Sequence, residues 1–115
     1  MSKKDNKKIE NVIMIRERDW WHIRKYHKSG HGALIVGESE QKDGYYYFLN
    51  ITKNPPLGYS YFETKKPINR GEEKSHIRLY LQKGKKKAFS RWKMKYELSI
   101  KDLDIVEKFL EKKRL

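Results

Sequence analysis

The segment from residue 33 to residue 51 constrains the fold most, because its pattern is that of a β-hairpin. Residues 33–36 form an apolar run of strand length, and residues 45–51 form a second, aromatic-rich run. The polar stretch between them ends in Asp43-Gly44, a pair typical of hairpin turns. Antiparallel β-structure is therefore expected in the middle of the chain.

Further short strands and one helix are expected around this hairpin. Three more segments have strand-like patterns: residues 12–15, 59–62 and 76–82. Residues 20–26 fit either a strand or a turn of helix. Ser99 followed by Asp102 resembles a helix cap, and apolar residues then recur at helical spacing: Ile100, Leu103, Val106, Phe109 and Leu110. Five or six short strands with this helix predict a mainly β fold, a small antiparallel barrel or curled sheet whose open side the helix covers.

Length and charge narrow the class of protein. The 115 residues suffice for one domain, and we expect a mobile basic tail over residues 1–10 and a single domain over residues 11–115. Lys and Arg number 28 against 15 Asp and Glu, and the resulting net charge of +13 favours anionic partners. The chain has no cysteine and no apolar run of membrane-spanning length, so a cytoplasmic protein with no membrane partner is expected.

The positive charge is concentrated in residues 83–95, which contain seven basic side chains and no acidic one. Lysines contact phosphates without reading the base sequence, so this stretch predicts affinity for single-stranded nucleic acid. The interleaved Phe89, Trp92 and Met94 are expected to belong mostly to the core. The charged residues 63–74 are expected to form a loop.

Three histidines, His22, His27 and His31, lie in a window rich in basic and aromatic residues. Imidazoles titrate near neutrality, so two of them beside a phosphate can act as base and acid, although loop histidines are about as often solvated and inert. In an antiparallel hairpin, the start of the first strand and the end of the second lie together, which places His31 near Thr52 and Lys53. The histidine spacing matches no familiar zinc signature, so a metal-free site is preferred.

The succession of these elements resembles a known family. A turn precedes the apolar strand at residues 32–36, the second hairpin strand ends in Ile51-Thr52, a later strand spans residues 75–78, and an amphipathic helix ends the chain. Over residues 11–110 this order is similar to that of the MazF/PemK-type toxin endoribonucleases, including their ToxN-like relatives.

The resemblance implies an SH3-like barrel that cleaves single-stranded RNA without a metal. In such enzymes the ribose 2′-hydroxyl attacks the adjacent phosphate and leaves a cyclic phosphate. The family's basic residue and its Thr or Ser would correspond to His31 and Thr52. The family commonly has Arg-Pro where this sequence has His31-Gly32, so the basic role stays open among His31, Lys28 and His27. The resemblance also implies an antitoxin partner, either protein or RNA, and often a homodimer.

Two functions are therefore expected as alternatives. In the first, the chain is a metal-independent endoribonuclease without a cofactor, in which His31 or His27 moves protons while Lys28 and Thr52 stabilise the transition state. In the second, a small β-barrel binds nucleic acid without cleaving it. The residues expected to contact the RNA are Lys53, Ser75, Arg78, Lys85, Lys86, Lys87, Arg91 and Trp20.

Overall fold

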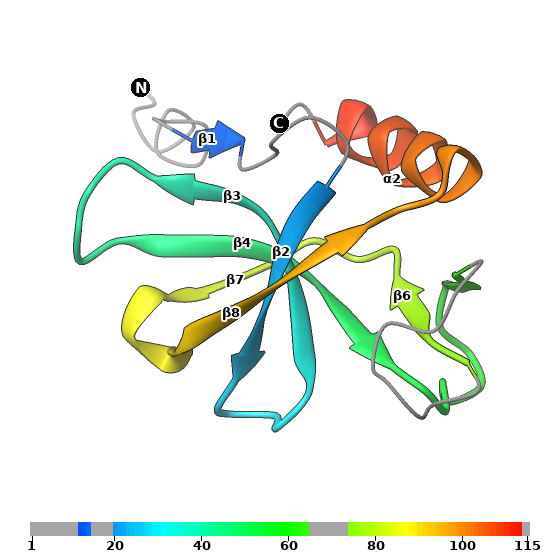
Figure 1. The fold of residues 1–115 in the computed structure, drawn as a ribbon, viewed down its shortest axis with the longest axis horizontal. Coiled ribbons are helices and arrows are strands. Elements are labelled where there is room, and N and C mark those ends of the chain that lie inside the picture. The colour runs from blue at the N-terminus through cyan, green and yellow to red at the C-terminus, as the bar shows by residue number, and fades with distance from the viewer. Residues whose placement is uncertain (1–11, 15–19, 65–73, 114–115) are drawn as a thin grey trace.

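The computed structural model describes residues 12–14, 20–64 and 74–113, which form one antiparallel sheet and a C-terminal helix (Figure 1). The strands are β1 (Val12–Met14), β2 (Trp20–Tyr26), β3 (Gly32–Ser39), β4 (Tyr45–Thr52), β5 (Tyr61–Glu63), β6 (His76–Arg78), β7 (Gln82–Lys85) and β8 (Phe89–Glu97). A short 3-10 helix, η1 (Lys86–Ala88), joins β7 to β8, and the helix α2 spans Ile100–Lys112. The mainly β, antiparallel class with a terminal helix is confirmed.

The predicted hairpin, β3 and β4, occupies the middle of the sheet. Hydrogen-bonded strands follow the order β5-β6-β4-β3-β2-β8, with β1 added to β3 and β7 to β4. Within the hairpin, Gly32 pairs with Ile51 and Ile35 with Phe48, and a register shift after Ile35 then places Gly37 opposite Tyr47. Such bulges bend a strand and increase its twist, which helps the sheet to curl.

Both faces of β3 are buried, which explains why its sequence is apolar without alternation. On one face, Leu34 and Val36 pack in a cluster that includes Val106 of α2. On the other face, Ala33 and Ile35 pack in a cluster with other members: Phe48, Phe89, Tyr26, Tyr46 and Ala88. The hairpin is therefore held from two sides, so its ends are fixed relative to the rest of the fold.

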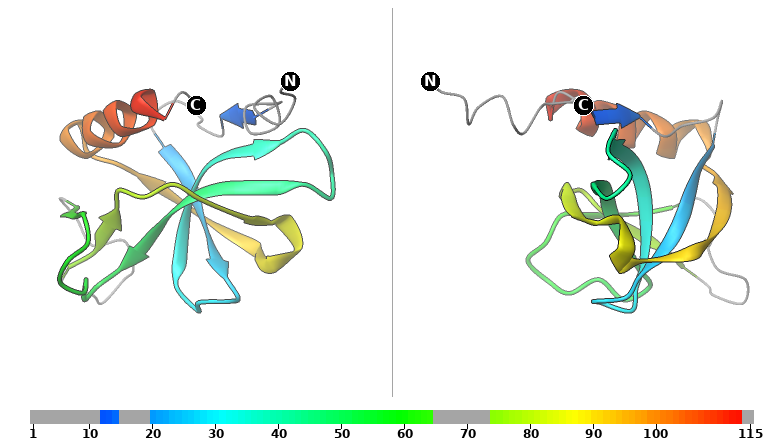
Figure 2. Two further views of the ribbon diagram at one scale, coloured as in Figure 1. Left: turned by 180° about the vertical axis from the view of Figure 1, so that it is seen from behind. Right: turned by 90° about the vertical axis from the view of Figure 1, so that its left-hand side faces the viewer.

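The sheet curls so that β7 approaches β2 and β8 (Figure 2). β7 is bonded to β4, and β8 to β2. β7 nevertheless lies close to Tyr26 of β2 and Phe89 of β8. A Cβ placed on Gly84 of β7 would lie 3.1 Å from the Tyr26 ring and 3.2 Å from the Phe89 ring. Within the described residues, β7 and β8 are not paired with each other. Among the described residues the fold is therefore the curled sheet and not the barrel of the two expected forms, with eight strands where five or six were expected.

The terminal helix begins at the predicted cap. Ser99 Oγ accepts a hydrogen bond from the backbone N–H of Asp102 at 3.2 Å. Val106 and Leu110 are buried against the sheet, as the helical spacing predicts. Ile100 was expected on the same apolar face, but at the first helical position it is 88% exposed. In the described part of the chain, no helix is long and apolar enough to cross a membrane.

The strand predicted at residues 76–82 is interrupted. Ile77 pairs with Ile51, and continuing that register would place Phe48 opposite Tyr80. Phe48 instead pairs with Gln82, so two extra residues are accommodated between β6 and β7. The alternating sequence pattern does not reveal this insertion, because it depends on where β4 offers partners. As a result, Tyr80 leaves the sheet and is 52% exposed.

The remaining expectations concern three strands, the N-terminal tail and the long loop. Residues 20–26, which fitted either a strand or a helical turn, form β2. The strands expected at residues 12–15 and 59–62 are present as β1 and β5, with slightly different bounds. The expected tail at residues 1–10 and most of the expected loop, residues 65–73, lie outside the described residues.

Candidate functional site

The open end of the β3–β4 hairpin forms a pocket of about 650 Å³. Its lining comes from both strands and from the segment that follows them: Gly30, His31, Gly32, Asn50, Ile51, Thr52, Lys53, Asn54, Pro56 and Tyr61. His31 and Thr52 therefore lie at one site, as the antiparallel register predicts, because Gly32 pairs with Ile51. Lys53 is among the residues that line the same pocket.

The turn that precedes β3 fixes His31 at the pocket rim. Gly30 has a φ of 77°, a left-handed conformation that favours glycine, and its N–H donates to the Tyr26 carbonyl at 2.8 Å. The backbone N–H of Tyr26 donates to the His31 carbonyl at 2.9 Å, and that of His31 donates to Ser29 Oγ at 3.1 Å. The backbone is thus tied on both sides, while the imidazole of His31 is exposed to solvent.

Thr52 ends β4 and lines the same pocket. Its Oγ1 accepts a hydrogen bond from the backbone N–H of Asn54 at 3.3 Å, which orients the hydroxyl oxygen. Lys53 follows and is exposed. An imidazole, a hydroxyl and an ammonium group are thus carried by residues that line one pocket. These are groups that can move a proton, donate hydrogen bonds and neutralise a phosphate.

A second histidine, His76, lies beside Thr52 and was not assigned a role from the sequence. Thr52 pairs with His76 across β4 and β6, and His76 pairs with Glu63 across β6 and β5. His76 Nε2 lies 4.0 Å from Glu63 Oε1, and its buried Nδ1 has no hydrogen-bond partner. A hydroxyl, an imidazole and a carboxylate thus form one row across three strands. The pairing that creates this row is long-range, so no local sequence signal could have found it.

Three residues expected near the phosphate lie elsewhere. His27 and Lys28 occupy the exposed turn after β2 and are not among the described lining residues of the pocket. Ser75 was expected to contact RNA but is 0% exposed, and its carbonyl accepts hydrogen bonds from Thr64. Ser75 therefore holds the segment before β6 against β5 and cannot reach a ligand in this conformation.

Arg78 lies on β6, two residues after His76, and its guanidinium contacts aromatic rings. The guanidinium carbon is 4.5 Å from the ring centroid of Tyr59 and 4.4 Å from that of Tyr80. Arg78 was expected to contact the RNA. The structure instead places the planar cation against two tyrosines that are each more than half exposed.

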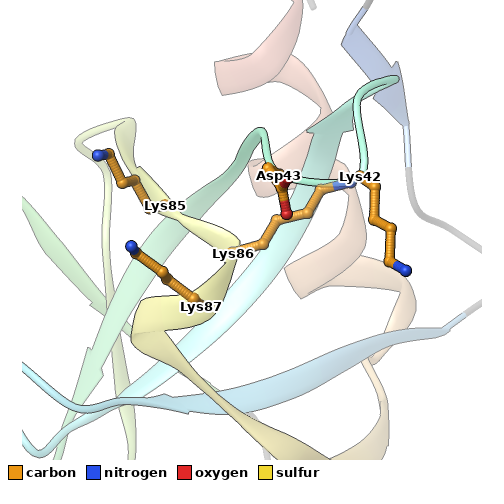
Figure 3. A pocket seen from close by; sticks show the side chains of 5 residues that line it. All are labelled: Lys42, Asp43, Lys85, Lys86 and Lys87. Carbon is orange, nitrogen blue, oxygen red and sulfur yellow. The ribbon is translucent and has the colours of Figure 1, made fainter.

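The lysines at residues 85–87, at the end of β7 and in η1, include one side chain that is held by the fold and two that are exposed (Figure 3). Lys86 points toward the hairpin turn, where its Nζ lies 2.9 Å from Glu38 Oε1. The same ammonium donates to the carbonyls of Ser39 at 3.1 Å and Gln41 at 3.0 Å. Lys86 is therefore engaged in contacts within the fold, and its expected contact with RNA stays a prediction. Lys85 and Lys87 are exposed. A second pocket, of about 560 Å³, is lined by Lys42, Asp43, Lys85, Lys86 and Lys87.

The other residues expected to contact RNA lie along β2 and β8. Trp20 begins β2 opposite Glu97, and its side chain lies outside what the structure describes. Arg91 is exposed on β8. Among the aromatic residues expected in the core, Phe89 is 4% exposed, whereas Trp92 is 70% exposed. The expectation of buried aromatics therefore holds for Phe89 and is wrong for Trp92.

The three sequence-neighbouring histidines are not brought together. His22 lies in the sheet with 6% exposure, His27 in the turn and His31 at the pocket rim. Burial, together with the nearby positive charges of Arg24 and Lys93, lowers the pKa of His22 to about 4, against a smaller opposing effect of Glu38. His22 is thus a neutral core residue at neutral pH.

This lowered pKa predicts a pH-dependent stability. Below pH 6.5 the unfolded chain protonates His22 while the folded chain does not, so stability present at pH 7 is lost as pH falls toward 4. At pH 5 the loss from this group is about 2 kcal/mol. Urea unfolding at pH 7 and pH 5 checks the prediction: His22→Leu should show a correspondingly smaller difference between the two pH values. His27→Leu, at an exposed position, should behave as wild type, and equal pH dependence in all three proteins would contradict it.

No protein-family model, no curated protein and no solved structure matches the chain. Across the described segments, no three His, Asp or Glu side chains are grouped so that they could hold a metal ion. The function is therefore inferred from the residues that line and surround the pocket at the open end of the β3–β4 hairpin.

Proposed function

We propose that this chain is an endoribonuclease that cleaves single-stranded RNA at the hairpin-end pocket, the pocket lined by His31, Thr52 and Lys53. The observation that carries the proposal is that these three residues line one pocket. Cleavage by 2′-hydroxyl attack needs proton transfer and stabilisation of negative charge on the phosphate, and these side chains supply both. The net charge of +13 attracts the polyanionic substrate.

In the proposed reaction, a base takes the proton of the ribose 2′-hydroxyl, and the 2′-oxygen attacks the adjacent phosphorus. The bond from phosphorus to the 5′-oxygen of the next nucleotide breaks, and that oxygen receives a proton. The products are a 2′,3′-cyclic phosphate and a 5′-hydroxyl. His31 moves the proton at the pocket rim, while Lys53 and the Thr52 hydroxyl stabilise the non-bridging oxygens. His76, beside Thr52, is a second imidazole available for proton transfer.

The biological setting follows from the same proposal. An RNA-cleaving chain in the cytoplasm must be held inactive, so we propose that it is the toxin of a toxin–antitoxin system. The antitoxin, a protein with acidic character or an RNA, would neutralise the positive surface. A homodimer is part of this proposal, by analogy with the family that the sequence resembles.

Incubation of mixed single-stranded RNA with the purified chain in excess EDTA tests the proposal. Cleavage of the RNA by wild type, and its loss in Thr52→Val, is the expected result. Valine keeps the shape of threonine and removes only the hydroxyl. Intact RNA after incubation with wild type would contradict the proposal.

A second candidate function is a module that binds single-stranded RNA without cleaving it. The observation that favours it is the exposed set Lys42, Lys85 and Lys87, which lies at the turn end of the hairpin. That end is roughly 20 Å from the hairpin-end pocket, given about 3.3 Å per residue along a strand. A basic surface so far from the pocket suits binding of the backbone several nucleotides away.

The contribution of this surface is predicted to appear in the salt dependence of binding. If Lys85 and Lys87 each contact one phosphate, replacing both by alanine makes the negative slope of log K against log salt shallower by about 1.4. Fluorescence anisotropy with a labelled single-stranded RNA at several salt concentrations measures this slope. The matched control replaces Lys101 and Lys112, exposed lysines of α2, and should leave the slope unchanged. Equal slopes for both double variants would contradict a specific role of Lys85 and Lys87.

A further inference from the structure

A second feature beside the hairpin-end pocket is the tyrosine clamp, which consists of Tyr59, Arg78 and Tyr80. The Arg78 guanidinium lies over both rings, with 4.5 and 4.4 Å from its central carbon to the ring centroids. Tyr59 is 56% exposed and Tyr80 is 52% exposed. Each ring therefore offers part of its surface to solvent while the cation holds it in place.

Backbone hydrogen bonds make the clamp rigid. Tyr61 of β5 pairs with Arg78 of β6, and the backbone N–H of Leu79 donates to the Ser60 carbonyl at 2.8 Å. These contacts fix the residue after Tyr59 and the residue before Tyr80. The two-residue insertion between β6 and β7 is what brings Tyr80 out of the sheet. Exposed rings on a fixed backbone lose little conformational entropy when they bind a ligand.

The clamp is continuous with the hairpin-end pocket. Tyr61, which pairs with Arg78, is itself part of the pocket lining. On the other side, Thr52 pairs with His76, two residues before Arg78. A strand of RNA with one phosphate in the pocket therefore has its neighbouring nucleotides within reach of the two rings.

We propose that Tyr59 and Tyr80 stack nucleobases of single-stranded RNA that flank the phosphate in the hairpin-end pocket, with Arg78 holding the rings. This inference rests on the proposed function for its ligand class. Stacking on aromatic rings tolerates every base, and a nearby cation adds attraction for the anionic backbone. The exposed tyrosines, the cation and the adjacent phosphate-binding groups together match a nucleotide better than an apolar ligand.

Binding of a strand that cannot be cleaved tests the stacking separately from the reaction. The probe is a fluorescent 2′-O-methyl RNA of mixed sequence, because the methyl group blocks 2′-hydroxyl attack. The Tyr59→Leu/Tyr80→Leu double variant should bind it at least about tenfold more weakly than wild type. Tyr59→Phe/Tyr80→Phe keeps the rings and should bind within about twofold of wild type. Trp92→Leu, which removes an exposed aromatic residue of β8, should also retain affinity.

An abasic strand identifies the bases as the contacted groups. With every base removed, the wild type and the double leucine variant should bind equally, because only the bases stack. The inference is overturned if the double leucine variant keeps wild-type affinity, if its loss is equally large on the abasic strand, or if wild type binds no strand. A binding loss in a protein that never cleaves RNA would support stacking and refute the endoribonuclease. Cleavage by wild type, together with unchanged binding by the double leucine variant, would support the endoribonuclease and refute the stacking.

Discussion

Replacing His31 with alanine is expected to lower the single-turnover rate of RNA cleavage by about 10²- to 10⁴-fold, the usual contribution of one general acid or base. The side chain is exposed at the pocket rim, and its turn is held by backbone hydrogen bonds that alanine retains. The fold should therefore persist. Because the imidazole acts in the reaction rather than in binding, the Kd for a 2′-O-methyl strand should stay within about threefold of wild type.

Two matched variants make this result specific. His27→Ala removes an exposed imidazole from the same turn, outside the described pocket lining, and should cleave as wild type does. His76→Gln removes the imidazole beside Thr52 and reports whether proton transfer depends on both histidines. A His31→Ala protein with undiminished cleavage would contradict the assignment of His31. A large loss of cleavage in His27→Ala instead would assign the basic role to His27.

Replacing Lys86 with methionine is expected to destabilise the fold by about 2 kcal/mol, because it removes the ammonium group that contacts three acceptors. The ammonium contacts Glu38 and the carbonyls of Ser39 and Gln41, and the Lys86 side chain is only 17% exposed. Methionine preserves most of the aliphatic length, so the loss reports the charge and the hydrogen bonds. Urea denaturation at pH 7 measures the change as a lower midpoint at an unchanged slope.

The neighbouring lysine provides the control for this variant. Lys87→Met alters an exposed side chain one position along the chain and should change stability by less than about 0.5 kcal/mol. For RNA binding the larger loss is expected in Lys87→Met, because the Lys87 side chain is exposed and can contact phosphate while Lys86 is engaged in the fold. Equal stability of the two variants would show that the Lys86 contacts contribute nothing to the fold.

The local parts of the fold could be predicted from the sequence. Asp43-Gly44 between two apolar runs predicts the central hairpin, and the register of that hairpin is enough to place His31 beside Thr52. Ser99 and Asp102 predict the start of α2 in the same way, since a helix cap involves neighbouring residues. These signals are short-range, and the structure confirms them.

The parts that the sequence could not predict depend on contacts between distant strands. The row of Thr52, His76 and Glu63 requires the pairing of β4, β6 and β5, which no local pattern specifies. No feature of the basic run distinguishes Lys86 from its neighbours, because its partner Glu38 is distant in the sequence. Ser75, expected at the phosphate, is buried because β6 joins the sheet immediately after it.

The chemistry of the product ends tests the central claim most directly. Wild-type protein is incubated in excess EDTA with mixed single-stranded RNA, and in parallel with the same sequences carrying 2′-O-methyl groups. The account predicts cleavage of the first substrate only, with 2′,3′-cyclic phosphate and 5′-hydroxyl ends. Cleavage of the methylated strands, or ends with 5′-phosphate, would contradict attack by the 2′-hydroxyl. RNA that is bound but left intact would contradict the endoribonuclease and leave a binding module.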